Sequence, residues 1–318
     1  RIMMNHLWRK KKFFLGGLFT LLLFVLMHSL IQSGLVSRHI QSLSVPVGLN
    51  MILALSLFLL VGMLGELSLG HAGFMSIGAY AGGLFSKAMV QVIPVWIRFP
   101  LALCVGALVA ALLALLLSVP VFRLKGDYLA IVTLAFGEIV RSLVINLPFT
   151  GGAAGLKGIP KDTSFSFLYW IVVFTIWLTM WIYSSKIGLE WRAIRDNAIA
   201  AEACGIPVVS RKRTAFVVAA SLAGVAGVLY SHHYSILTAE VFGFNRSIEV
   251  LVMVVLGGLE SAIATAVSAF FLTIAPEMLR FLNQYRMLIY SLVLIIVMIG
   301  RNTQWEKPKW FQQRRENA

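Results

Sequence analysis

Four ionisable side chains stand inside long apolar stretches of this 318-residue chain. Glu66 and His71 border a glycine-rich run, and Glu138 and Arg141 lie three positions apart further along. Residues at this spacing share one face of a helix, so Glu138 and Arg141 can pair with each other. Because charges at membrane depth are costly, such a pair either joins helices or contacts a transported solute. The chemistry indicated is binding of ions or polar solutes.

The glycine-rich run over 65–83 carries most of the candidate functional residues of the first half. Glycine permits close helix packing or an unwound backbone, and unwound backbone at membrane depth is tolerated only where protein or a cavity covers it. Two interpretations are open: Glu66 at a span end and His71 as a packed helix cap, or a run that lines a translocation path. The candidate path residues are Ser68, His71, Gly73, Phe74, Thr133 and Glu138.

Catalytic and metal-binding patterns are absent from the sequence. His232 and His233 are adjacent and lack a His-x-x-x-His or carboxylate frame, and no Gly-x-Ser-x-Gly elbow occurs. The glycine-rich stretch 150–160 is not a Walker A loop, because Leu156 precedes Lys157. Cys104 and Cys204 form no disulfide framework or metal spacing. We therefore expect no catalytic residue, no metal and no cofactor in this chain, and no enzymatic activity.

The elements that position these residues are membrane helices. Hydrophobic residues make up 59% of the chain and charged residues 13%, which excludes a soluble globular enzyme because too few charges remain for its surface. A bilayer core needs roughly 20 apolar helical residues per crossing. Ten segments qualify if the short eighth one crosses: 13–31, 47–65, 71–92, 99–121, 128–147, 166–184, 214–235, 246–258, 260–282 and 285–300. We interpret the first as a retained helix, because no A-x-A cleavage site follows it.

The basic residues predict the orientation of these spans. The formal net charge is +14, and three blocks hold 16 of the 27 Lys and Arg residues: 1–12, 185–213 and the tail after 300. Basic residues collect in cytoplasmic loops, so both termini are expected inside and the number of spans is even. The predicted organisation is a cytoplasmic tail over 1–12, a transmembrane domain over 13–300 with a cytoplasmic loop at 185–213, and a second tail over 301–318. This placement explains the positive charge without nucleic acid.

The cytoplasmic loop predicts a short amphipathic helix over 191–204. Gly205 and Pro207 end it, and Trp191, Ile194, Ala198 and Ala201 fall on one side at helical spacing. Such a helix either lies on the membrane surface or docks a cytoplasmic partner.

Several motifs together carry a resemblance to a known family. Glu202-Ala203-Cys204-Gly205 resembles a degenerate form of the coupling motif of ABC importer permeases. With it stand 67–74 (Leu-Ser-Leu-Gly-His-Ala-Gly-Phe), 126–128 (Gly-Asp-Tyr) and 192–196 (Arg-Ala-Ile-Arg-Asp). Over roughly 45–300 the chain resembles the permease subunit of a branched-chain amino acid ABC importer, the second of two paralogous membrane subunits. Urea importer permeases share much of the pattern.

The resemblance implies an all-α, polytopic transmembrane bundle of about ten segments, type II-like, in a bacterial plasma (inner) membrane. It implies a second homologous permease, two cytoplasmic ATPases that bind the ATP and Mg, and a periplasmic or lipid-anchored substrate-binding protein. The residues expected to couple to the ATPases are Arg192, Arg195, Asp196, Glu202, Ala203, Cys204, Gly205 and Ile206. One departure is the sequence after Gly257-Gly258, where Leu259-Glu260-Ser261 replaces the family's usual Gly-Ser and Gly-Pro.

Other functions remain open at this point. A urea or amide importer needs a small polar pocket in place of an apolar one. A stand-alone secondary transporter needs an ion-coupling site, for which Glu66, Glu138 and Arg141 are the candidates.

Overall fold

The computed structural model describes residues 38–122, 127–278, 291, 292 and 295. The tails at 1–12 and 301–318, the first predicted span and nearly all of the last lie outside these residues. Of the described residues, those up to Phe270 form one compact unit, and 271–278, 291, 292 and 295 belong to a second.

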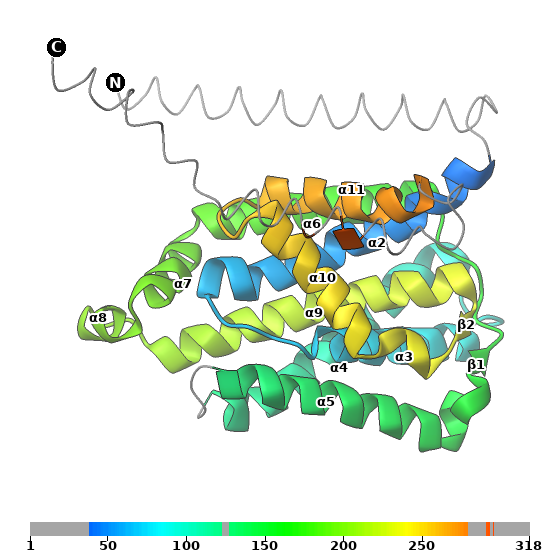
Figure 1. Ribbon diagram of the computed structural model, residues 1–318. Coiled ribbons are helices and arrows are strands. Elements are labelled where there is room, and N and C mark those ends of the chain that lie inside the picture. The colour runs from blue at the N-terminus through cyan, green and yellow to red at the C-terminus, as the bar shows by residue number, and fades with distance from the viewer. Residues whose placement is uncertain (1–37, 123–126, 279–290, 293–294, 296–318) are drawn as a thin grey trace, which may run out of the picture. The chain divides into compact units, whose positions relative to one another are not determined.

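The described part of the chain is almost wholly helical (Figure 1). Its long helices are α2 (Arg38–Phe58), α3 (His71–Ala88), α4 (Val95–Val121), α5 (Asp127–Asn146), α6 (Phe165–Ser184), α9 (Val208–Tyr234) and α11 (Ala262–Met278). Shorter ones are η1 (Leu59–Leu64), η2 (Pro148–Thr150), η3 (Gly152–Ala154), α7 (Lys186–Asp196), α8 (Ala198–Ala203), η4 (Ala239–Phe242) and α10 (Phe244–Gly257). Two short strands, β1 (Leu156–Lys157) and β2 (Ile236–Leu237), pair antiparallel with Leu156 opposite Leu237.

Five described helices are long and apolar enough to cross a membrane: Ser42–Leu64, Val95–Val121, Tyr128–Asn146, Phe165–Ser184 and Val208–Tyr234. Four further predicted segments correspond to α3, α10, α11 and the few described residues after 290. The helix α3 falls outside the five because glycine, alanine and polar residues make up most of it. Most of its residues are buried, so its composition suits protein contact rather than lipid contact.

Small residues let the central helices of residues 1–270 approach closely. The helices α3, α4 and α9 pack together, and α9 runs between α2 and α5 in Figure 1. A Cβ on Gly78 would overlap the backbone of Gly224, and one on Gly227 would overlap the carbonyl of Met75. Glycines at these crossings therefore permit backbone contact between α3 and α9, as at tightly packed helix pairs in membranes.

The outward faces of α4 and α6 are apolar. Leu108, Leu112 and Leu116 on α4 are exposed at helical spacing, as are Trp170, Phe174 and Trp181 on α6. An exposed apolar stripe on a long apolar helix suits contact with lipid.

Candidate functional site

An unwound segment joins α2 to α3 within the glycine-rich run, where the sequence left open close helix packing or an unwound backbone. The helix α2 continues into the π-helical turn η1, which ends at Gly65 in the left-handed conformation (φ 78°). Residues 65–70 are not helical, and α3 begins at His71. The backbone N–H of Leu69 donates to Thr133 Oγ1 of α5 at 3.1 Å. This contact satisfies a backbone donor that no helix satisfies, so α5 stabilises the break.

The backbone of Gly70 lies close against the backbone of α5 at Thr133. A Cβ at Gly70 would overlap the carbonyl oxygen of Thr133. Thr133 is fully buried, and its hydroxyl also donates to the Ala130 carbonyl at 3.0 Å. The structure therefore places Thr133 at a helix contact and not on an open surface.

His71 is buried between α2 and α3. Its Nε2 lies 2.6 Å from Ser56 Oγ, and the Ser56 hydroxyl donates to the Leu53 carbonyl at 2.7 Å. Because the single hydroxyl proton is engaged there, His71 donates from Nε2 and Nδ1 is the unprotonated nitrogen. Among the described residues Nδ1 has no hydrogen-bond partner, and neither has the buried hydroxyl of Ser68.

Gly73 and Phe74 face α5 and α9. A Cβ on Gly73 would come within 3.0 Å of Gly137 Cα, so glycine keeps α3 close to α5. The ring of Phe74 is buried, with ring centroids 5.0 Å from Phe136 and 5.3 Å from Phe216. Phe74 is thus part of the packed core between α3, α5 and α9.

A shallow crevice opens beside this junction, where α3, α5 and α10 meet. The start of α3 and the start of α10 are tied together there, since the backbone N–H of Ala72 donates to Ser247 Oγ at 3.1 Å. The crevice is too shallow to enclose a solute, and Glu138 is its charged member; its lining residues are Leu69, Ala72, Gly73, Leu134, Gly137, Glu138, Phe242, Gly243, Phe244 and Ser247. Two of the six predicted path residues, Gly73 and Glu138, line this crevice.

The expected pair between Glu138 and Arg141 is present. Arg141 Nε donates to Glu138 Oε2 at 2.8 Å, and the side chains are 38% (Arg141) and 42% (Glu138) exposed. Both residues belong to α5, so this hydrogen bond joins no two helices.

The loop over 185–213 contacts the unwound segment directly. Arg195 of α7 donates from Nη1 to the Gly62 carbonyl in η1 at 2.7 Å, and its side chain also packs on Gly65. Glu66 forms an ion pair with Lys212, near the start of α9. A second ion pair joins Glu190 to Arg211. The sequence singled out Glu66 and Arg195 but not the partners Lys212, Glu190 and Arg211, which it counted only as basic or loop residues.

The loop contains two helices where the sequence predicted one over 191–204. Asn197 has an extended backbone (φ −159°, ψ 103°) and its side chain accepts from the Ala200 N–H at 3.0 Å. Asparagine is a strong N-cap residue, so α7 ends and α8 begins there. The prediction of an uninterrupted helix was wrong because it gave no weight to this cap.

The apolar residues that were predicted to share one side of the loop helix anchor α7 and α8. Trp191, Ile194 and Ala201 are buried, and Ala198 is half-buried. Arg192 donates to the Tyr183 carbonyl at 3.1 Å, and its guanidinium stacks on the Tyr183 ring with 4.1 Å to the centroid. Arg192 therefore fixes α7 to α6.

Residues 202–205 form the tip of the loop, which is exposed. Glu202, Ala203, Cys204 and Gly205 are exposed, Asp196 is exposed and bonded to Arg195, and Ile206 is half-buried. Ile199 of α8 is 82% exposed. Gly205, with φ 81°, ends the tip before Pro207 caps α9. The predicted coupling residues thus divide into anchors on α7 and an exposed tip from α8 onward.

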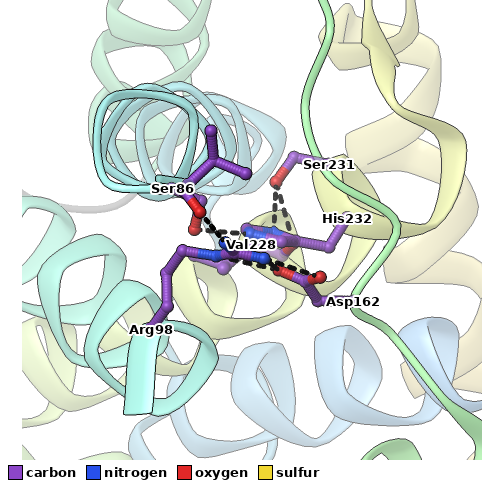
Figure 2. A network of polar contacts seen from close by, with 7 residues as sticks. Ser86, Arg98, Asp162, Val228, Ser231 and His232 are labelled. Carbon is purple, nitrogen blue, oxygen red and sulfur yellow. Dashed lines mark hydrogen bonds and ion pairs between the residues drawn. The ribbon is translucent and has the colours of Figure 1, made fainter. Parts of the chain in front are cut away.

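A buried polar network that the sequence did not predict lies at the other end of α9 (Figure 2). Arg98 of α4 donates to both carboxylate oxygens of Asp162, at 3.0 and 2.7 Å, and to the Val90 carbonyl at 3.1 Å. The side chains of Arg98 and Asp162 are 7% and 8% exposed.

His232 extends this network towards α3, as Figure 2 shows. Its Nδ1 donates to the Val228 carbonyl at 2.8 Å, so Nε2 accepts from the Ser86 hydroxyl at 2.7 Å. Both nitrogens are engaged within the protein, which makes His232 a structural residue. Within the described ranges, no cluster of three or more His, Cys, Asp or Glu side chains is arranged to hold a metal ion.

The amino-acid sequence of the chain is similar to those of several known proteins. Residues 40–298 match the family described as "Branched-chain amino acid transport system / permease component". The chain is 34% identical over 302 positions to the high-affinity branched-chain amino acid transport system permease protein LivM of Salmonella typhimurium, covering 84% of this chain and 70% of the relative. LivM of Escherichia coli K12 gives the same values.

A relative with a different name, LivH, matches a shorter part of the chain. The permease protein LivH of the high-affinity branched-chain amino acid transport system of Escherichia coli K12 is 28% identical over 141 positions, covering 43% of this chain and 46% of LivH. No solved structure matches the chain.

Proposed function

The chain belongs to the branched-chain amino acid permease family, and from this premise we propose that it is a membrane-spanning subunit of an ABC importer for branched-chain amino acids. ATP is hydrolysed by separate cytoplasmic subunits, which also bind the Mg. This chain supplies one wall of the pathway and the surface on which an ATPase docks.

One observation carries the coupling part of this proposal: an exposed tip, Glu202–Gly205, is connected through a firmly anchored helix to an unwound membrane segment. Arg195 on that helix donates a hydrogen bond to the Gly62 carbonyl. The backbone N–H of Leu69, in the unwound segment, donates to the hydroxyl of Thr133 on α5. Movement of the tip therefore reaches α5 through two hydrogen bonds and the packed residues around them. Alternating access requires this kind of connection between a cytoplasmic motor and a membrane gate.

The partners follow from the family. The similarity to both LivM and LivH supports a pair of homologous permeases with the pathway between them. Two ATPases dock on the tips, and a periplasmic or lipid-anchored binding protein delivers the ligand. In the pair this chain has about ten membrane segments in a type II-like arrangement, with both termini cytoplasmic in a bacterial inner membrane.

Branched-chain amino acids are the favoured substrates over urea. The family description names branched-chain amino acid transport, and so do the names of the two LivM relatives.

The test is to co-express the chain with its genomic neighbours, purify the assembly into nanodiscs and measure ATP hydrolysis. The binding protein is added with leucine, with urea and without ligand. We expect co-purification of an ATPase pair and a sister permease, and stimulation of hydrolysis by leucine.

Other outcomes would change the conclusion. Stimulation by urea alone would reassign the substrate. Absence of any associated ATPase, together with uptake driven by a proton or sodium gradient through the chain alone, would replace the proposal by a secondary transporter.

A further inference from the structure

The charge pair on α5 is unusual in its surroundings. Glu138 and Arg141 lie within the candidate span Tyr128–Asn146, yet about two fifths of each side chain is exposed, at 42% and 38%. Charged groups inside a membrane span rarely face lipid, and they usually face protein or a water-filled cavity. This face of α5 is therefore covered by something other than hydrocarbon when the protein is in a membrane.

A structural role within this chain does not account for the pair. Its hydrogen bond runs between two residues of the same helix, three positions apart. Among the described residues neither side chain bonds to another helix, so removing the pair breaks no interhelical link in this subunit.

The pair also has unused bonding capacity. The contact occupies Arg141 Nε and Glu138 Oε2. In the described part of the chain, Glu138 Oε1 and the terminal guanidinium nitrogens of Arg141 have no further partner. A carboxylate oxygen and a guanidinium edge are thus available side by side, and together they match the ammonium and carboxylate of an amino acid.

We propose that Glu138 and Arg141 form this subunit's half of a binding site for a zwitterionic amino acid inside the membrane. Glu138 accepts from the substrate ammonium, and Arg141 donates to the substrate carboxylate. The inference rests on the proposed function, since the sister permease supplies the opposite wall.

The experiment uses the complete importer in proteoliposomes, with leucine-loaded binding protein outside and ATP inside. Leucine uptake and ATP hydrolysis are measured for Glu138→Gln, for Arg141→Gln and for the exchanged pair Glu138→Arg/Arg141→Glu. Glu249→Gln is the matched control. It also removes an ion pair between residues three apart on one helix, with Glu249 58% exposed, and Glu249 does not line the crevice.

We expect each single substitution to lower leucine uptake by about tenfold or more, because each removes a charge-assisted hydrogen bond to the substrate. ATP hydrolysis should stay within about twofold of the unaltered importer, because the tip and the unwound segment are untouched. The exchanged pair should fail as well, since it restores the ion pair but reverses the polarity that the zwitterion meets. Glu249→Gln should transport normally.

Three results would overturn the inference. Normal uptake by the single variants would remove the site. Recovery of uptake in the exchanged pair would make the ion pair structural. Loss of the sister permease from the purified single variants would make this surface a subunit interface. Each of these requires the unaltered importer to take up leucine, so they differ from a failure of the proposed function, in which the unaltered assembly itself takes up no leucine.

Discussion

The Arg195 guanidinium donates to the carbonyl oxygen of Gly62 at 2.7 Å, across 133 positions of sequence. This hydrogen bond joins α7 to the last turn of the first described membrane helix, just before the chain unwinds. A charged donor satisfies a backbone acceptor at a helix end, which is a favourable contact. In the proposed importer it connects the helix that carries the docking tip to the membrane segment that is expected to move.

Replacing Arg195 with Ala should uncouple the importer. ATP hydrolysis should continue while leucine uptake falls by about tenfold, because a hydrogen bond to a charged group contributes roughly 1.5–3 kcal/mol. Parallel assays of hydrolysis and uptake in proteoliposomes measure both. Lys186→Ala is the control, an exposed cation at the start of the same helix. Equal uptake in the two variants would show that the contact carries no coupling.

The ion pair between Glu66 and Lys212 should respond to charge exchange. Both side chains are mostly buried, at 17% and 22% exposed. Glu66→Lys places two cations together at the unwound segment, and leucine uptake should fall by about fivefold, the effect of a coupling free energy near 1 kcal/mol. The double variant Glu66→Lys/Lys212→Glu should recover most of the uptake. If the double variant is as impaired as the single one, the residues act separately.

Gly70 and Gly137 should differ sharply on replacement with Ala, although they lie in the same contact between the unwound segment and α5. A Cβ at Gly70 would overlap the Thr133 carbonyl, whereas one at Gly137 would lie 3.5 Å from Gly70 Cα, an ordinary contact. Gly70→Ala should cost about 2–3 kcal/mol through overpacking. Gly137→Ala should be neutral or stabilise α5 by up to about 1 kcal/mol. Thermal unfolding of the purified chain in detergent measures both, and similar unfolding temperatures would contradict the close approach.

The buried pair of Arg98 and Asp162 should be sensitive to loss of one partner. Asp162→Asn leaves the Arg98 charge buried without its counter-ion, which costs about 3–5 kcal/mol and should lower the unfolding temperature by roughly 10 °C. Arg98→Met/Asp162→Leu should recover much of this loss, because no charge remains buried. Lys87→Ala is the control, since Lys87 makes an exposed hydrogen bond to the Lys157 carbonyl. An unchanged unfolding temperature in Asp162→Asn would contradict the buried geometry.

The sequence alone was sufficient for the features that depend on local pattern. Apolar length predicted helices at the positions of α4, α5, α6 and α9. The glycine-rich run indicated close helix packing or an unwound backbone, and the structure has both. The motifs around 67–74 and 192–205 identified the family, which the comparisons confirm. Spacing of three residues was enough to predict the contact of Glu138 with Arg141, because one helix sets that geometry.

Features that depend on tertiary contact were not predictable in the same way. Glu66 was visible as a charge beside the break, but its partner Lys212 is 146 positions away and was counted only as part of a basic loop. The sequence analysis did not single out Arg98 or Asp162, since only folding places them together in a buried site. The sequence analysis missed the interruption of the helix at Asn197 for a local reason. This asparagine lies inside a run of good helix formers but acts as the N-cap of α8.

The central claim is that ATP hydrolysis is coupled through the exposed tip, and the two cysteines of the chain test it directly. Both are free and exposed, Cys204 at the tip and Cys104 on α4 within a candidate span. A thiol-reactive photo-crosslinker is attached to the cysteines of the assembled importer. The sample is irradiated, and the adducts are identified by mass spectrometry. The account predicts adducts between Cys204 and an ATPase subunit, and no ATPase adduct at Cys104. An importer that takes up leucine in an ATP-dependent manner, yet gives no ATPase adduct at a fully labelled Cys204, would contradict it.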